Sequence, residues 1–169
     1  TVDMAGSINL GAGDLKITGE DTNNGAQQNV ATLKITGDVT ANGGIALTSG
    51  WVQDGSRMLG AVLILDGTAA TQTVTGAITA TADQDGTIIV RNSFGTGVTF
   101  ASAIGANGAN EVGQVLVGDA TAAGNATFSS TVDTENLLID GQLGASSATF
   151  TGVVTTTGAG AGTGLIKIV

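Results

Sequence analysis

Two carboxylates that stand two residues apart are the side chains in this sequence most capable of chemistry. Asp83 and Asp85 belong to the stretch Asp-Gln-Asp-Gly. On a strand this spacing places both on one face, and glycosidases use such carboxylate pairs. Alternating carboxylates followed by glycine also form the first half of a calcium loop. The later ligands of such a loop are missing, so an acidic turn before a strand is the favoured interpretation, with Asp83 and Asp85 as weak calcium candidates.

The rest of the sequence offers little else for catalysis. It contains no histidine and no cysteine, and no serine stands in a nucleophile-elbow pattern. A second cluster of oxygen ligands, GEDTNNG at residues 19–25, is again favoured as an acidic turn. We therefore predict that the protein is not an enzyme, with no catalytic residues, no cofactor-binding residues and no cofactor apart from the calcium alternative.

Charge and composition exclude several classes of partner. The chain of 169 residues carries 14 acidic and 5 basic side chains, a net charge of -9. Nucleic acid requires a basic surface, so we expect no nucleic-acid partner. No apolar run approaches the length of a transmembrane helix, so we expect no transmembrane segment. The chain opens at Thr1 without a leader pattern, which predicts a processed chain or a fragment.

A short strand phrase followed by a polar or glycine turn recurs along the chain. Its third residue is Ile or another aliphatic, and its middle residue varies. The phrases are residues 15–17, 33–35, 63–65, 88–90, 115–117, 137–139 and 166–168. A second phrase begins with Phe or Val and ends with Ile or Val four residues later, at residues 74–78, 100–104, 128–132 and 150–154. The two phrases recur in phase, which is typical of stacked repeats.

This recurrence predicts an all-β fold, specifically a parallel β-solenoid (β-helix) with coils of about 25 residues. The alternative is an antiparallel β-sandwich, which also has short strands at regular spacing. We expect one elongated β-repeat domain over residues 1–169, with the clearest repeats at 62–158. Residues 40–61, with Trp51 and Arg57, are expected to form the largest excursion. We further expect Phe100, Phe128 and Phe150 to stack inside, with Val74 continuing their column.

The middle residues of the first phrase should face outward, because alternate strand residues point to opposite faces. They are charged at both ends of the chain and aliphatic in the centre: Lys16, Lys34, Ile64, Ile89, Leu116, Leu138 and Lys167. Contiguous exposed apolar stripes are rare on monomers. The four aliphatic residues are therefore either covered by a loop of the same chain or form an assembly face.

The last residues combine a glycine-rich segment with an aliphatic strand. Residues 155–164 are expected to form a tether. Leu165, Ile166, Ile168 and Val169 surround one lysine in a strand-forming pentapeptide. An open apolar edge invites pairing, so this terminal strand either completes the last repeat of its own chain or acts as a donor strand for another subunit.

The repeats of residues 62–158 also resemble a known group of proteins. Stretches such as TGAITATADQDGTIIV and NLLIDGQLGASSATFTGVV are similar to the β-strand repeats of large bacterial surface proteins. These include rickettsial surface antigen passengers and S-layer-like proteins of alphaproteobacteria. The 169 residues are far fewer than in that family, and we expect no membrane β-barrel domain among them, which leaves open whether the chain is a fragment or a small subunit. The resemblance implies an exported structural protein.

We therefore expect an extracellular or cell-surface protein that assembles with copies of itself into a surface layer, fibre or adhesin. The alternative is a phage tail-fibre segment or a glycan-binding adhesin module that contacts a glycan or host surface, because LKITGDVTANGGIALTSG resembles phage tail-fibre repeats, which are usually trimeric. Native filaments or lattices would favour the first expectation, and discrete trimers the second.

Overall fold

The computed structural model describes residues 1–21, 28–49, 60–106, 110–157 and 164–169, and in these ranges the chain is all-β without a helix. The first sheet has eight strands. In pairing order they are β1 (Val2–Met4), β5 (Ala31–Ile35), β8 (Ala61–Leu65), β11 (Asp85–Val90), β13 (Val112–Val117), β15 (Val132–Ile139) and β17 (Val154–Thr156), with β18 (Leu165–Ile168) also paired to β15.

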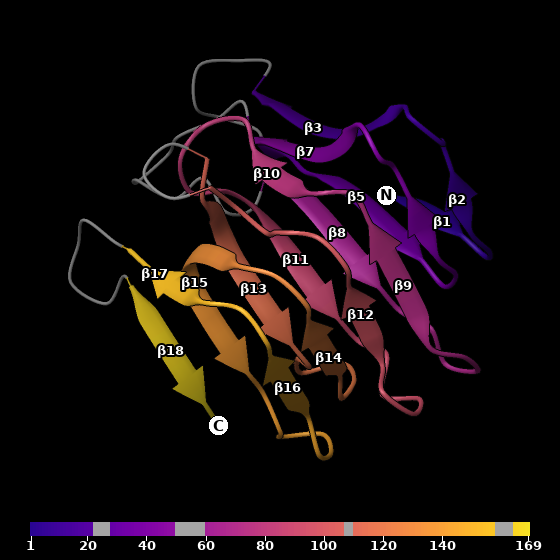
Figure 1. The fold of residues 1–169 in the computed structure, drawn as a ribbon, viewed down its shortest axis with the longest axis vertical. Helices are drawn as coiled ribbons and strands as arrows, with labels where there is room; N and C mark the ends of the chain where they lie inside the picture. Colours follow the sequence, from indigo (N-terminus) through magenta and orange to yellow (C-terminus); the bar gives the residue numbers. More distant parts are fainter. Residues whose placement is uncertain (22–27, 50–59, 107–109, 158–163) are drawn as a thin grey trace.

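Two further sheets accompany the first. The second consists of β16 (Ser147–Phe150), β14 (Asn125–Phe128), β12 (Val98–Phe100), β9 (Gln72–Thr75), β6 (Val39–Thr40) and β2 (Ile8–Asn9). The third consists of β10 (Ile78–Ala80), β7 (Gly44–Ser49), β3 (Asp14–Asp21) and β4 (Gln28–Asn29). Figure 1 shows the strands of the first sheet in a row from β1 to β18, with β9, β12, β14 and β16 in a row alongside.

Parallel pairing dominates the fold. Among the strands that the structure describes, only β3 and β4 pair antiparallel, through Glu20–Asn29 and Asp21–Gln28. Isolated parallel bridges link Ile78 to Ile104 and Ile104 to Val132, which extends the third sheet toward β15. The prediction of an all-β chain is confirmed, and the antiparallel sandwich alternative is wrong.

The first copy of the strand phrase lies in a different sheet from the one predicted. Leu15 and Ile17 pair with Ile45 and Leu47 in the third sheet. The place beside Leu33 and Ile35 is taken by Val2 and Met4 of β1. The reason is that an apolar–polar–apolar triplet fits any parallel strand, and its position relative to the turns decides which sheet it joins.

The region expected to be the largest excursion is partly regular structure. Residues 40–61 include Thr40 of β6, all of β7 and Ala61 of β8, so the prediction of an excursion is wrong for those strands. The low-complexity stretch GGIALTS was not predicted to be a strand, but most of it forms β7, in which alternate residues are buried. Trp51 and Arg57 lie outside the described residues. The tether prediction is similarly wrong at Thr155 and Thr156, which belong to β17.

The predicted phenylalanine column is present in the second sheet. Val74, Phe100, Phe128 and Phe150 are register partners on β9, β12, β14 and β16. The rings of Phe100 and Phe128 stack with centroids 5.0 Å apart, and those of Phe128 and Phe150 with centroids 4.9 Å apart. These distances match the spacing of neighbouring strands. Phe100 and Phe128 are fully buried, and Phe150 is half-buried at the edge.

Buried amides tie the first two sheets together where the chain turns between them. The Gln72 side-chain nitrogen donates to the carbonyls of Ile35 (3.1 Å) and Gly37 (2.8 Å). The Asn92 side-chain nitrogen donates to Gln72 Oε1 at 3.0 Å. Since both amides are buried, these bonds satisfy groups whose burial would otherwise be costly.

Candidate functional site

The outward-facing aliphatic residues form one continuous row across the first sheet. We call Ile64, Ile89, Leu116 and Leu138 the aliphatic row. Ile64 pairs with Ile89, Ile89 with Leu116, and Leu116 with Leu138. Parallel strands set these neighbours about 4.8 Å apart. The register therefore brings four residues from distant parts of the sequence onto one line.

Exposure differs along the aliphatic row. Ile64 and its neighbour Val62 are each only 8% exposed, yet neither belongs to the hydrophobic core cluster. Strand β8 is thus covered on both faces within the single chain. Ile89, Leu116 and Leu138 are half-buried and remain accessible on β11, β13 and β15. These three residues are the part of the row that is available to a partner.

Charged residues border the aliphatic row at both ends. Lys34 pairs with Ile64, and its ammonium lies 3.6 Å from Asp3 Oδ2 and 3.7 Å from Asp66 Oδ2. Lys167 pairs with Leu138 on the opposite side and is exposed. Lys16, which the sequence placed in this row, lies in the third sheet. Ion pairs that are open to solvent add little stability. The role of these charged residues is therefore to end the aliphatic row on each side.

One ion pair next to the row is tighter. Arg91 Nη2 and Nε lie 2.7 and 2.8 Å from Asp119 Oδ2. Burial raises the pKa of Asp119, but the hydrogen bonds from Arg91 and from the backbone N–H groups of Thr121 and Ala122 outweigh burial. The pKa of Asp119 therefore lies below its ordinary range. This pair fixes the loop after β13 at the edge of the face.

Two buried glutamates, one directly before β13 and one inside β15, were not singled out by the sequence patterns. Glu111 and Glu135 are 2% and 3% exposed. Burial, and then the negative charges of Glu111 and Asp83, raise the pKa of Glu135. Thr157 Oγ1 hydrogen-bonds to Glu111 Oε1. The polar stretch Asp133-Thr-Glu-Asn136 directly before the apolar Leu137-Leu-Ile139 resembles an exposed segment, so no sequence pattern signals this burial.

Glu135 predicts a pH dependence of stability. Its raised pKa means that the folded chain holds the proton more tightly than the unfolded chain, whose glutamates titrate near about 4.3. The resulting stability is complete below that value and is lost as pH rises through the raised pKa. Glu135→Gln should therefore flatten the decline in unfolding free energy as the pH rises above the ordinary range of a glutamate, measured by urea denaturation.

The matched control is Asp14→Asn, because Asp14 is an exposed carboxylate at the start of β3. The control variant should keep the wild-type slope. An unchanged slope in Glu135→Gln, or an equal change in both variants, would contradict the assigned role of Glu135.

The two calcium candidates do not converge on a common point. Asp83 is exposed, whereas Asp85 is 1% exposed and belongs to β11. Asp85 Oδ2 accepts hydrogen bonds from the backbone N–H groups of Ser49 and Ala82, both at 3.2 Å. Among the described residues, no group of three or more acidic, histidine or cysteine side chains is placed to hold a metal ion. These contacts give Asp85 a structural role at the start of β11. The second oxygen cluster, at residues 19–25, lies largely outside the described residues.

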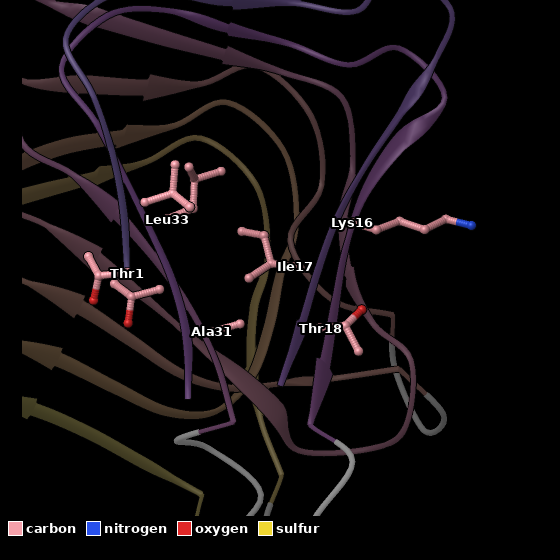
Figure 2. Close-up of a pocket in the computed structure, with 8 residues that line it drawn as sticks. Thr1, Lys16, Ile17, Thr18, Ala31 and Leu33 are labelled. Carbon is pink, nitrogen blue, oxygen red and sulfur yellow. The ribbon is translucent and has the colours of Figure 1, made fainter. Parts of the chain in front are cut away.

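A pocket of about 390 Å³ opens near the N-terminus between β1, β5 and β3. Its lining includes Val2, Ile17, Ala31 and Leu33. Figure 2 shows Ile17 and Leu33 directed toward this space, while the Lys16 ammonium points away from it. The lining thus combines apolar side chains with threonine side chains. It marks an open end of the core.

The terminal strand pairs within its own chain. Ile166 and Ile168 of β18 are register partners of Leu137 and Ile139 on β15. The N–H of Val169 donates to the Ile139 carbonyl at 3.0 Å. All residues of β18 are nevertheless exposed, with Ile168 at 75%. Of the two predicted pairings, this structure contains the one within the chain.

No protein-family model matches this chain, and comparisons with curated proteins and with solved structures give no match. Within the described ranges, no helix is present that could span a membrane. The site must therefore be interpreted from its own geometry, and the aliphatic row is its most distinctive feature.

Proposed function

We propose that this chain is an extracellular structural protein that assembles with copies of itself into a surface layer, fibre or adhesin. We further propose that its fold is a parallel β-solenoid with coils of about 25 residues. The successive partners Leu33, Leu63, Ile88, Val115 and Leu137 support the solenoid, because each step along the sheet advances the chain by one repeat. The aliphatic row is the observation that carries the assembly proposal.

The energetics favour assembly in arrays over isolated pairs. Full burial of an aliphatic side chain contributes about 1.5–3 kcal/mol. Ile89, Leu116 and Leu138 are already half-buried, so covering them contributes roughly 2–4.5 kcal/mol in all. Association costs at least about 4 kcal/mol in lost translational and rotational freedom. One such contact is therefore weak, and a lattice or filament in which each copy makes several contacts is required.

The negative charge of the chain is consistent with a regulated assembly. A net charge of -9 keeps separate molecules apart. Salt screens this repulsion over about 10 Å at 0.1 M ionic strength. Apolar contacts do not weaken with added salt. Self-association through the aliphatic row should therefore become stronger as salt is raised.

This expectation can be tested with the purified chain. Sedimentation velocity over a range of concentration and salt, with negative-stain micrographs of the same samples, should show polymers that increase with both. Discrete trimers would favour the alternative of a phage tail-fibre segment or glycan-binding module. A monomer under all conditions would contradict the proposed function.

A further inference from the structure

The two ends of the strand array are open in the described part of the chain. One end presents β1, β2 and residues 14–19 of β3, and the other presents β16, β17 and β18. Each of these segments has a strand partner on one side only. The N- and C-termini lie at these opposite ends of the array (Figure 1).

Both ends also present apolar residues in place of a polar cap. Ile8 and Leu15 at one end, and Phe150 and Val154 at the other, are half-buried and pack against the core. On the first sheet, Val2 is 59% and Ile166 is 53% exposed. Stacked-repeat proteins require polar terminal repeats to remain soluble alone. Apolar ends of matching residue type are suited to contact with a second copy of this chain.

Register determines how two copies fit. In the second sheet, a column of six runs through Ile8, Val39, Val74, Phe100, Phe128 and Phe150. In the third, a column of six runs through Leu15, Ile45, Ile78, Ile104, Val132 and Val154. In the first, the column has seven members: Val2, Leu33, Leu63, Ile88, Val115, Leu137 and Ile166.

The first sheet has one strand position more than the other two, and this creates a steric conflict between stacked copies. A copy displaced by six strand spacings places its β2 beside β16 and its β3 beside β17. The same displacement puts its β1 in the position beside β15 that β18 occupies. A displacement of seven spacings would keep β18 but leave one strand position empty in both other sheets. Close contact at all three sheets therefore requires one strand, either β18 or the incoming β1, to leave.

Charge favours the displacement of β18 over that of the incoming β1. Asp3 of β1 forms an ion pair with Lys34 of β5. If β18 stayed and replaced the β1 of the incoming copy, Lys167 would occupy the position of Asp3 and face Lys34. Like charges on directly neighbouring strands are destabilising. Retaining β1 keeps the ion pair, so β18 is the strand that is displaced.

We propose that copies of this chain stack end to end, with β1 of one copy pairing to β15 of the next, and that β18 is a removable cap that competes for this position. This inference rests on the proposed self-assembly. It adds a longitudinal contact that is distinct from the lateral contact of the aliphatic row, and a step that controls it. Pairing of β18 with β15 lowers the apparent affinity of one copy for the next. The affinity falls in proportion to the fraction of molecules in which this position on β15 is free.

The first test is deletion of residues 165–169. The truncated chain should form filaments at a concentration roughly tenfold or more below that needed by the full chain, since the competing strand is gone. Sedimentation velocity and negative-stain micrographs measure this. The same deletion in an Ile89→Lys/Leu116→Lys background should give single filaments without lateral association.

A second test uses the full chain, in case truncation impairs folding. Asn136 and Leu165 are register partners on β15 and β18, and the sequence has no cysteine. Neighbouring strands are within disulfide range, so Asn136→Cys/Leu165→Cys should lock β18 in place when oxidised. The oxidised protein should remain unstacked, and reduction should restore stacking.

The outcomes separate the two proposals. If the full chain assembles but the folded truncated chain does not, or if the oxidised protein stacks as well as the reduced one, the removable cap is wrong and the proposed function stands. If neither the full nor the truncated chain self-associates, both proposals fail. Asp3→Lys should also prevent stacking, whereas Asp3→Glu, which keeps the negative charge beside Lys34, should not; stacking that tolerates Asp3→Lys would contradict the charge argument.

Discussion

Replacing Phe128 by alanine should cost about 3–5 kcal/mol of unfolding free energy, the typical range for removing a buried aromatic ring. Phe128 is 1% exposed, and its ring stacks on Phe100 and on Phe150. Neither neighbour can move into the space, because each is held at its own strand position. Domains of this size have total stabilities of about 5–15 kcal/mol, so the variant should unfold at much lower urea concentration, as followed by circular dichroism.

Two other phenylalanines provide graded controls. Phe150→Ala should cost less than Phe128→Ala, because Phe150 is half-buried and has a ring on one side only. Phe94 is 51% exposed outside the column, and Phe94→Ala should change stability by at most about 0.5 kcal/mol. Equal losses in all three variants would contradict the assignment of the column as the structural core of the second sheet.

The sequence was sufficient to predict the columns where bulky residues recur at a fixed phase. Phe100, Phe128 and Phe150 share a phrase whose ends are apolar and whose interior is small, and this pattern determines both strand and register. The aliphatic row follows from the same register, since alternate residues of a strand face opposite sides. Its alignment from Ile64 to Leu138 was therefore predictable without coordinates.

Other features were not predictable, for identifiable physical reasons. The triplet Leu15-Lys16-Ile17 fits any parallel strand, so the pattern could not decide between the first and third sheets. Gln72 and Asn92 look like surface residues until their backbone partners are known. The coverage of Ile64 is not part of the repeated pattern, because the equivalent residues Ile89, Leu116 and Leu138 are only half-buried. The burial of Glu135 gave no signal, because its neighbours Asp133, Thr134 and Asn136 are also polar.

The second large effect concerns assembly. Ile89→Lys combined with Leu116→Lys should leave the fold intact and abolish lateral association. Both residues are half-buried on the outer face, so lysine can keep its charge in water while its stem covers the sheet. In a packed contact the same two charges would be desolvated, at a cost of several kcal/mol each. Sedimentation velocity should show that lateral polymers are lost.

The matched control carries the same charges on another face. Thr99 and Thr127 are register partners on β12 and β14 of the second sheet, and both are half-buried between inward-facing residues. Thr99→Lys/Thr127→Lys should associate as the unmodified chain does. If this control loses assembly as completely as the row variant, the effect is one of net charge, and the aliphatic row is not the lateral contact.

The most direct test measures whether the row is covered in assembled material. Because the chain has no cysteine, Leu116→Cys and, separately, Thr73→Cys on the outer side of β9 each introduce a single reactive thiol. The rate at which each thiol is alkylated is then measured in dispersed and in assembled protein. We predict that assembly slows alkylation at position 116 by roughly tenfold or more, corresponding to a local protection of about 1.4 kcal/mol, and leaves position 73 nearly unchanged. Equal alkylation rates at position 116 in dispersed and assembled protein would contradict the account.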